Sequence, residues 1–273
     1  MNVAILTQPL TNNYGGILQN FALQEVLRRK GYDVTTLNIR RPIANLQIDL
    51  HWLLSILKRF VQKYILKDEQ ILFVNAYKQM NWGNIPQPFQ QRFIDEHIKV
   101  DHAGPDALTE ANDTYDAYIV GSDQVWRPCF SSGLLTNYYL DFVQNPNAKR
   151  LAYAASFGVD HWETEESTTK IIALLAQKFG GISVREPSGM KLCKDYLSVD
   201  AVNVLDPTML LSSDDYRKVY REHPSKDEKQ PYIATYVLDK TPQVHRVIQS
   251  VSQQIGLPVK PLGTPTKTCF SSI

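Results

Sequence analysis

A strand–helix–strand pattern opens the chain: residues 2–39 read NVAILTQPLTNNYGGILQNFALQEVLRRKGYDVTTLNI. Residues 3–6 are a short apolar run, which predicts a buried strand, and residues 7–16 form a polar loop that contains two glycines. Apolar residues at helical spacing predict a helix over residues 17–30, and residues 33–39 predict a second strand. Two strands joined through a helix have the size of one right-handed βαβ crossover.

The same alternation continues along the chain. Short apolar runs predict further strands at residues 115–120, 150–155, 182–184, 202–205, 232–238 and 257–262. Helical spacing recurs at residues 46–80, 163–179, 188–196, 214–220 and 242–255. Strands that alternate with helices are typical of an α/β protein with a largely parallel, Rossmann-like sheet.

A charged stretch near the end divides the chain. The segment REHPSKDEKQ, residues 221–230, contains a proline and predicts a linker. We therefore expect an N-terminal domain over residues 1–221 with a helical insertion at about 46–80, and a linker over 222–230. Residues 231–273 contain two predicted strands and one helix, too little to bury a core alone. They predict the start of a second, incomplete Rossmann-like domain.

Composition excludes several classes of protein. Of the 273 residues, 43% are hydrophobic and 21% charged, as in ordinary globular proteins. The 29 Lys and Arg against 28 Asp and Glu leave a net charge of +1, so no broad field attracts nucleic acid. Three separated cysteines without CxxC, and no HExxH, argue against disulfide and zinc frameworks. Without a signal peptide or a long apolar run, the sequence predicts a soluble, cytoplasmic protein.

The sequence does not determine which surface one amphipathic segment contacts. Residues 50–65 carry an apolar stripe on one face and basic side chains on the other. Such a helix can lie on a membrane surface, at the inner face of the membrane. An apolar stripe at this spacing more often packs against the core or against another subunit of a homo-oligomer.

The first candidate binding element is the loop after the first predicted strand. It contains Asn13, Tyr14, Gly15 and Gly16. The glycines allow a ligand close to the backbone, and the helix N-terminus offers N–H groups to an anion or a sugar hydroxyl. The alternative is an ordinary turn with an asparagine cap. Neither GxGxxG nor GxxxxGK[ST] occurs, which excludes the usual dinucleotide and P-loop patterns.

The second candidate follows the strand predicted at residues 115–120. Gly121, Ser122 and Asp123 place a hydroxyl and a carboxylate at the strand tip. Asp123 can orient a sugar hydroxyl or act as a base. Trp126 can offer its face to a sugar ring, and Arg127 can bind phosphate or carboxylate. The alternative is a capped helix start with a packed tryptophan.

Three further strand ends carry polar residues. Ser156 lies in a small-residue turn after the strand predicted at residues 150–155. Arg185 is a candidate anion clamp, and Glu186 is its partner or an acid, although an exposed ion pair explains both equally well. The segment LDPT, residues 205–208, is interpreted as a structural turn.

Several motifs together resemble the polysaccharide pyruvyl transferase family over about residues 1–240. They are NNYGGILQNFALQEVLRRKGYDV, YDAYIVGSDQVWRP, YYLDFV, KRLAYAASFG, SVREPSG and VLDPTMLL. The resemblance implies a fold like that of GT-B glycosyltransferases. It also implies transfer of a pyruvyl group from phosphoenolpyruvate to a sugar of a cell-surface polysaccharide or its lipid-linked precursor, without a metal or an organic cofactor.

Given this resemblance, the candidate residues acquire roles. Arg185 would clamp the donor's anionic groups, with backbone amides of residues 13–16 as further donors. Asp123 would orient or deprotonate the acceptor, with Ser122 and Trp126 beside it. Asp123 and Glu186 are then the carboxyl groups from which an acid or base would come.

The sequence also departs from the family. Members usually carry an Asp-Ser-Phe-His-Gly-type motif whose histidine is the expected proton donor, and no such motif occurs here. The expectation is therefore a truncated member, with little or no transfer activity unless another chain supplies the missing part. A GT-B glycosyltransferase that uses a nucleotide sugar and a non-catalytic sugar-binding remnant are the alternatives.

Overall fold

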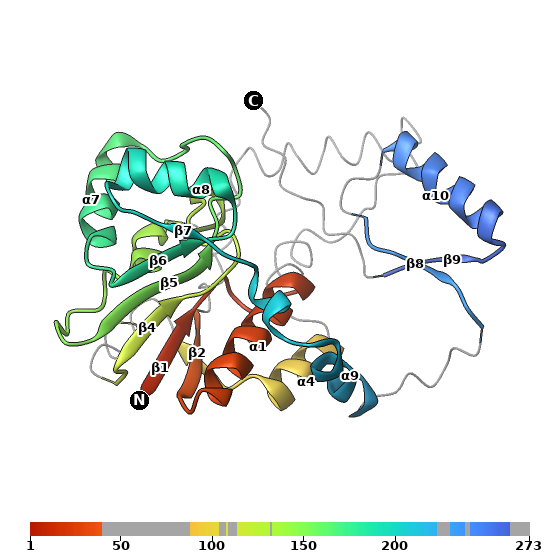
Figure 1. Cartoon of the computed structure of the whole chain (residues 1–273), viewed down its shortest axis with the longest axis horizontal. Coiled ribbons are helices and arrows are strands. Elements are labelled where there is room, and N and C mark those ends of the chain that lie inside the picture. Colours follow the sequence, from red (N-terminus) through yellow and green to blue (C-terminus); the bar gives the residue numbers. More distant parts are fainter. Residues whose placement is uncertain are drawn as a thin grey trace, which may run out of the picture. The chain divides into compact units, whose positions relative to one another are not determined.

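The computed structural model describes residues 1–39, 88–103, 108, 114–131, 133–222, 230–237 and 241–262. The chain divides into two compact units, unit 1 (Met1–Ser212) and unit 2 (Ser213–Ile273) (Figure 1). The helical stretch expected at residues 46–80 lies outside the described residues, as does most of the expected linker. The domain limits drawn from the sequence therefore stay predictions.

Unit 1 is built on a sheet of seven parallel strands. Their bounds are β1 (Asn2–Leu6), β2 (Asp33–Ile39), β3 (Val100–Ala103), β4 (Ala117–Val120), β5 (Lys149–Ala155), β6 (Gly181–Val184) and β7 (Val202–Asn203). They lie in the order β3-β2-β1-β4-β5-β6-β7, and every neighbouring pair is parallel. The direction of the connections reverses between β1 and β4, and this reversal is the topological switch point of the sheet.

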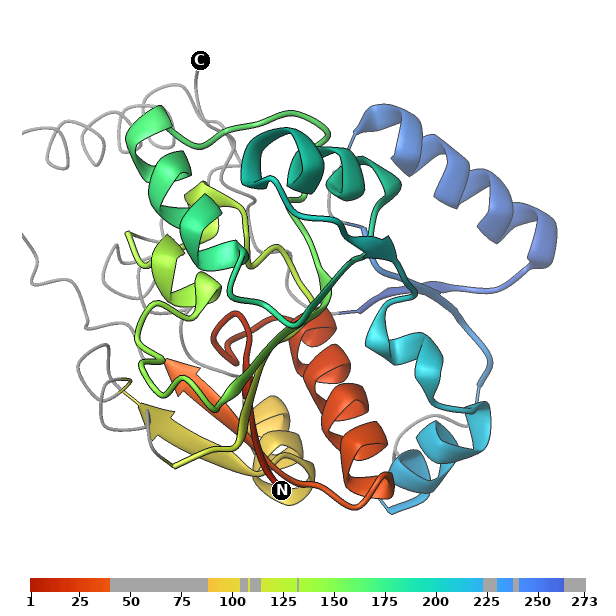
Figure 2. The same cartoon turned by 60° about the vertical axis from the view of Figure 1, so that its left-hand side comes forward.

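Helices cover both faces of this sheet (Figure 2). They are α1 (Tyr14–Arg29), α4 (Pro88–His97), α6 (Pro128–Ser131), η3 (Leu135–Tyr139), α7 (Glu166–Ala176), α8 (Pro187–Leu192), the π-helical turn η4 (Cys193–Leu197) and η5 (Pro207–Leu210). Figures 1 and 2 show α1 and α4 on one face and α7 and α8 on the other. This two-sided cover produces the α/β architecture that the sequence predicts.

Burial on both faces explains why the inner strands have uninterrupted apolar sequences. Val3 and Ile5 pack in one hydrophobic cluster with Leu23 of α1. Their neighbours on β1 point to the opposite face, where the second cluster includes Ile172 of α7 and Leu192 of α8. A parallel strand buried on both faces is hydrophobic at every position, not at alternate ones.

Several elements of unit 1, among them one helix of ten residues and one edge strand, are missing from the sequence prediction. No helix or strand was predicted for residues 88–103, but they contain α4 and the edge strand β3. Pro88 begins α4, where a missing N–H costs nothing. The four residues of β3, VDHA, include Asp and His and give no apolar run.

Unit 2 contains one small βαβ arrangement. Its elements are α9 (Ser213–Glu222), β8 (Ile233–Thr235), α10 (Pro242–Ile255) and β9 (Val259–Pro261), and β8 pairs with β9 in parallel. The limits of α10 agree with the predicted helix. Thr241 caps its N-terminus by accepting a hydrogen bond of 3.2 Å from the Val244 amide, and Gly256 ends it at φ 71°. No described residue of unit 2 is buried.

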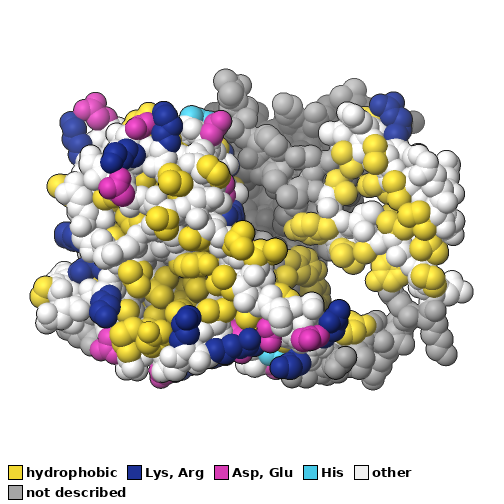
Figure 3. Space-filling view, in the orientation of Figure 1, with side chains coloured by type: hydrophobic (Ala, Val, Ile, Leu, Met, Phe, Trp, Pro, Cys, Tyr) yellow, Lys and Arg dark blue, Asp and Glu magenta, His cyan; other side chains and the backbone are white. Residues whose placement is uncertain are grey.

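Apolar side chains also reach the surface. Figure 3 shows them gathered over unit 1 in the view of Figure 1, and Val202, Leu205 and Met209, at and beyond β7, are 60%, 63% and 67% exposed. No helix in the described part of the chain is long and apolar enough to cross a membrane.

Two cysteines provide a test of this packing. Cys129 is exposed, whereas burial raises the pKa of the Cys193 thiol to about 12. Because alkylation requires the thiolate, we expect iodoacetamide at pH 8 to modify Cys129 in the folded protein and leave Cys193 unmodified. Unfolding in urea should make both react. Peptide mass spectrometry measures each site, and equal labelling without urea would contradict the buried position of Cys193.

Candidate functional site

A hydrogen bond spans the switch point of the sheet. Asn13 has extended backbone angles and caps α1, since its Oδ1 accepts a hydrogen bond of 3.2 Å from the Gly16 amide. Its Nδ2 donates to Oδ2 of Asp123 at 3.3 Å. Asn13 follows β1 and Asp123 follows β4, so this contact joins the two strand ends at which open α/β sheets usually bind ligands.

The residues after Asn13 form the first turn of α1, three residues earlier than the predicted start at residue 17. Two side chains approach Gly16 closely: a Cβ there would lie 3.0 Å from Asn13 Nδ2 and 3.4 Å from Asp123 Oδ2, so these side chains would have to shift to admit one. Gly15 is exposed on the first turn. The ring of Tyr14 stacks on that of Phe89, with 5.9 Å between centroids. The predicted loop is therefore a helix N-terminus.

The backbone of Asp123 is held in an unusual conformation. Its φ of 85° lies in the left-handed region, which Asp and Asn tolerate better than most other residues. Its carbonyl accepts the Ser156 amide at 3.1 Å, and its Oδ1 accepts the Gln124 amide at 2.8 Å. These contacts fix the carboxylate between the ends of β4 and β5.

The residues just before Asp123 are part of the packed strand end. Gly121 donates its amide to the Leu6 carbonyl at 2.8 Å, and a Cβ there would lie 3.2 Å from Ile5 Cγ2. Ser122 is 2% exposed, and its hydroxyl donates to Asp206 Oδ2 at 3.1 Å. Gly121 thus serves close packing, while Ser122 belongs to a polar network.

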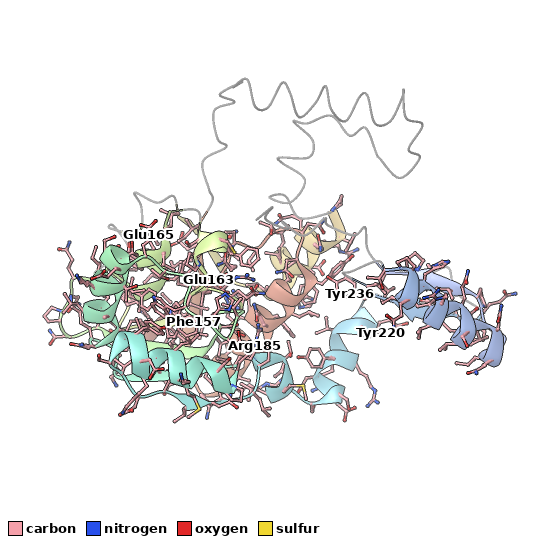
Figure 4. The ribbon with its side chains drawn as sticks, turned by 90° about the horizontal axis from the view of Figure 1, so that it is seen from above. Phe157, Glu163, Glu165, Arg185, Tyr220 and Tyr236 are labelled. Carbon is pink, nitrogen blue, oxygen red and sulfur yellow. The ribbon has the colours of Figure 1, made fainter. Side chains whose placement is uncertain are left out.

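That network centres on Arg185, which comes directly after β6 (Figure 4). Its Nη1 donates to Asp206 Oδ2 at 3.0 Å, and its Nε donates to Glu186 Oε1 at 3.1 Å. The same oxygen of Glu186 accepts the hydroxyl of the fully buried Ser156 at 2.9 Å. One guanidinium thus connects polar groups that follow β4, β5, β6 and β7.

Electrostatics stabilises the charged forms of the central pair. Burial alone would raise the pKa of Asp206, but hydrogen bonds from Thr208, Arg185 and Ser122 outweigh it and lower the pKa below its usual value. Burial alone would lower the pKa of Arg185, but its bonds to Asp206 and Glu186 raise it. The pair is therefore ionised throughout the physiological pH range.

We call this group of residues the carboxyl-edge cluster. Its members are Asn13, Ser122, Asp123, Ser156, Arg185, Glu186 and Asp206. It contains three carboxyl groups and one guanidinium, so it presents both hydrogen-bond acceptors for hydroxyl groups and a cation for an anion. Among the described residues, no three His, Cys, Asp or Glu side chains gather as metal ligands.

The sequence predicted an accessible Trp126, but this side chain lies in the core. The side chain is 1% exposed, stacks on Tyr139 with 5.1 Å between centroids, and also contacts Phe157. Its Nε1 donates to the Tyr138 carbonyl at 2.9 Å. The indole belongs to the hydrophobic core, so the prediction that its face meets a sugar ring is corrected.

The guanidinium of Arg127 is paired with Glu163, outside the carboxyl-edge cluster. Its Nε and Nη2 donate to the two carboxylate oxygens of Glu163 at 3.0 and 3.3 Å, and Nη1 donates to Gln124. The hydrogen bond to Glu163 raises the pKa of Arg127. A bidentate ion pair occupies the fork that was expected to bind a substrate anion, so the structure leaves Arg185 as the better candidate.

Asp206 is the residue that the sequence interpretation missed. Its segment was interpreted as a turn, and it is one: Asp206 Oδ1 accepts the Thr208 amide at 2.9 Å and caps η5. The other oxygen of the same carboxylate enters the cluster. The available signal was the position of an acidic residue beyond a strand end, the same signal that singled out Asp123.

Comparison with known proteins identifies the family. A model of the family described as polysaccharide pyruvyl transferase matches residues 13–266, and the chain belongs to this family. No match is found among curated proteins. Among solved structures, Escherichia coli glutamate racemase, in complex with L-glutamate and the activator UDP-MurNAc-ala, aligns over 96% of this chain and 98% of its own. The identity is 11% and the TM-score 0.21, values that support no argument.

Proposed function

We propose that this chain transfers a pyruvyl group from phosphoenolpyruvate to two hydroxyl groups of a sugar in a cell-surface polysaccharide or its lipid-linked precursor. Family membership supports a pyruvyl donor and a sugar acceptor. The arrangement that carries the proposal is Arg185 held at the same sheet edge as Asp123 and Glu186. Unit 1 would then be the N-terminal Rossmann-like domain of a GT-B-like enzyme that works in the cytoplasm.

The reaction sets the requirements of the site. A proton must be added to the methylene carbon of phosphoenolpyruvate, which becomes a methyl group and leaves a cation-like centre at C2. Two hydroxyl oxygens bond to C2, the C2–O bond to phosphate breaks, and the two hydroxyl protons leave. The protein must therefore bind anions, supply one proton and accept others. No step requires an added oxidant or reductant.

The cluster offers a group for each requirement. Arg185 donates Nε and Nη1 to carboxylates, and no described residue accepts from its Nη2, which can therefore bind the donor's carboxylate or phosphate. Asp123 lies across the switch point, where it can accept a hydrogen bond from a sugar hydroxyl. Glu186 contacts both Arg185 and Ser156, and its carboxyl group is the candidate for the proton transfer to the donor.

Phosphate release tests the proposal. The chain is incubated with phosphoenolpyruvate and a panel of β-galactosides and N-acetylmannosamine-containing acceptors, and released phosphate and ketal product are measured. Thermal shifts with phosphoenolpyruvate, UDP-sugars and GDP-sugars distinguish a pyruvyl transferase from a glycosyltransferase. Stabilisation by nucleotide sugars but not by phosphoenolpyruvate would overturn the assignment. Acceptor binding without turnover by any donor would instead indicate a non-catalytic sugar-binding module.

Asp123→Asn isolates the carboxylate. Asn keeps the size of the side chain and tolerates a positive φ, and its amide oxygen still accepts the Gln124 amide. Because the variant lacks the charge and the basicity, we expect kcat/KM to fall about 100- to 10,000-fold, the usual range for loss of a general acid or base. The hydrogen bond from Asn13 Nδ2 is lost, which should lower the free energy of unfolding by about 1 kcal/mol. Full transfer activity in this variant would exclude Asp123 from the chemistry.

A further inference from the structure

Asp206 bridges two strand ends that are not neighbours. Ser122 follows β4 and Arg185 follows β6, and β5 lies between these strands in the sheet. A single oxygen, Asp206 Oδ2, accepts from Ser122 Oγ at 3.1 Å and from Arg185 Nη1 at 3.0 Å. The contact therefore reaches over the end of β5.

The carboxylate is itself firmly held. Its other oxygen, Oδ1, accepts both the amide and the hydroxyl of Thr208, at 2.9 and 2.7 Å. Asp206 is the N-cap of η5, and η5 packs against α1, the helix that starts at the switch point. One oxygen thus anchors the side chain in η5, and the other is left to fix the positions of Arg185 and Ser122.

We propose that Asp206 is a positioning residue that fixes the Arg185 guanidinium for the donor's anionic group. The inference rests on the proposed function, in which Arg185 binds that group. Arg185 Nε donates to Glu186 and Arg185 Nη1 donates to Asp206, so two hydrogen bonds fix the plane of the guanidinium. The orientation of its remaining N–H groups is therefore fixed as well. A misplacement of about 1 Å at such a group can cost about 100-fold in rate.

The substitution Asp206→Asn separates orientation from charge. Asn retains an oxygen for Thr208, but it presents an NH2 group or an uncharged oxygen to Arg185. Loss of orientation should lower kcat for phosphate release about 10- to 100-fold. Loss of a nearby negative charge favours anion binding, so KM for phosphoenolpyruvate should stay unchanged or fall. A rise in KM at unchanged kcat would overturn the proposal.

Thr208→Val is the matched control. It removes the hydroxyl hydrogen bond to Asp206 Oδ1 and leaves both Oδ2 contacts in place. If Asp206 served only to cap η5, Thr208→Val would be as harmful as Asp206→Asn. We expect it to change kcat less than about threefold, since the guanidinium is still held. Equal losses in the two variants would contradict the positioning role.

A double-substitution cycle tests the route of the effect. When Arg185 is replaced by Lys, the guanidinium that Asp206 orients is absent. Adding Asp206→Asn to Arg185→Lys should therefore lower kcat for phosphate release by less than a further factor of about three. If the losses of kcat caused by the two single substitutions multiply in full in the double variant, Asp206 does not act through Arg185.

A spectroscopic measurement keeps the inference testable without turnover. In protein labelled with ¹⁵N-arginine, restricted rotation should separate the Nη proton signals of Arg185, which are assigned by their loss in Arg185→Lys. Asp206→Asn should merge these signals, and Thr208→Val should preserve them. Separate signals in Asp206→Asn would overturn the positioning role. Absence of phosphate release from the unaltered protein would instead overturn the proposed function.

Discussion

Arg185→Lys is expected to lower kcat/KM for phosphate release from phosphoenolpyruvate about 100- to 1,000-fold. Lysine keeps the positive charge, but it has a single ammonium group in place of the planar fork that contacts Asp206 and Glu186 together. The magnitude is that of removing one preorganised donor from a transition state. Binding is measured in parallel as the shift of the unfolding midpoint that phosphoenolpyruvate causes.

Arg127→Lys supplies the matched comparison. Arg127 is also an arginine beyond a strand end, but Glu163 occupies its fork. We expect a change in kcat/KM below about threefold, because Arg127 pairs with Glu163 and lies outside the carboxyl-edge cluster. If Arg127→Lys were the more damaging substitution, the donor anion would have to bind at Arg127 and the role of Arg185 would be disproved.

The second large effect concerns stability. Trp126→Ala should lower the free energy of unfolding by about 3–5 kcal/mol, the usual cost of deleting a buried tryptophan. The indole stacks on Tyr139, touches Phe157 and donates to the Tyr138 carbonyl, so the substitution leaves a cavity and removes that hydrogen bond. Urea unfolding of unit 1 measures the loss, and a value below about 1 kcal/mol would show that the ring is not a core element.

Trp162→Ala is the control for this prediction. Trp162 is only partly buried, although it stacks on Tyr196 with 4.5 Å between centroids and donates to Thr169 at 2.9 Å. Its loss should therefore cost clearly less than that of Trp126. If Trp126→Ala binds less acceptor, the loss should equal the fraction of the protein that is unfolded. Removal of a residue that stacks on the sugar would instead lower acceptor binding in fully folded protein.

Much of unit 1 was predictable because a parallel sheet has a simple signature. Its inner strands are continuous apolar runs separated by helical spacing, and β1, β4, β5 and β6 were found from this pattern. The edge strand β3 was missed because it is short and polar. The start of α1 was placed too late because glycines usually indicate a loop, yet Gly16 lies in the first turn of the helix, where Asn13 and Asp123 approach it closely.

The candidate site was predictable in position but not in detail. Parallel strands end at one edge of a sheet, so the sequence indicated that Asp123, Ser156 and Arg185 lie near that edge. It did not indicate which polar residues are already paired. The core position of Trp126, the Glu163 partner of Arg127 and the bridge made by Asp206 depend on contacts between distant segments, which local patterns do not encode.

The parallel order of the sheet also has a kinetic consequence. The carboxyl-edge cluster takes residues from the ends of five strands, and four of its contacts join residues that lie 21 to 110 positions apart in the chain. Such non-local contacts form late, after most of the entropy of loop closure has been lost. A folding intermediate that lacks β6 or η5 therefore has no complete cluster, so a bound ligand would slow unfolding while leaving the rate of refolding nearly unchanged.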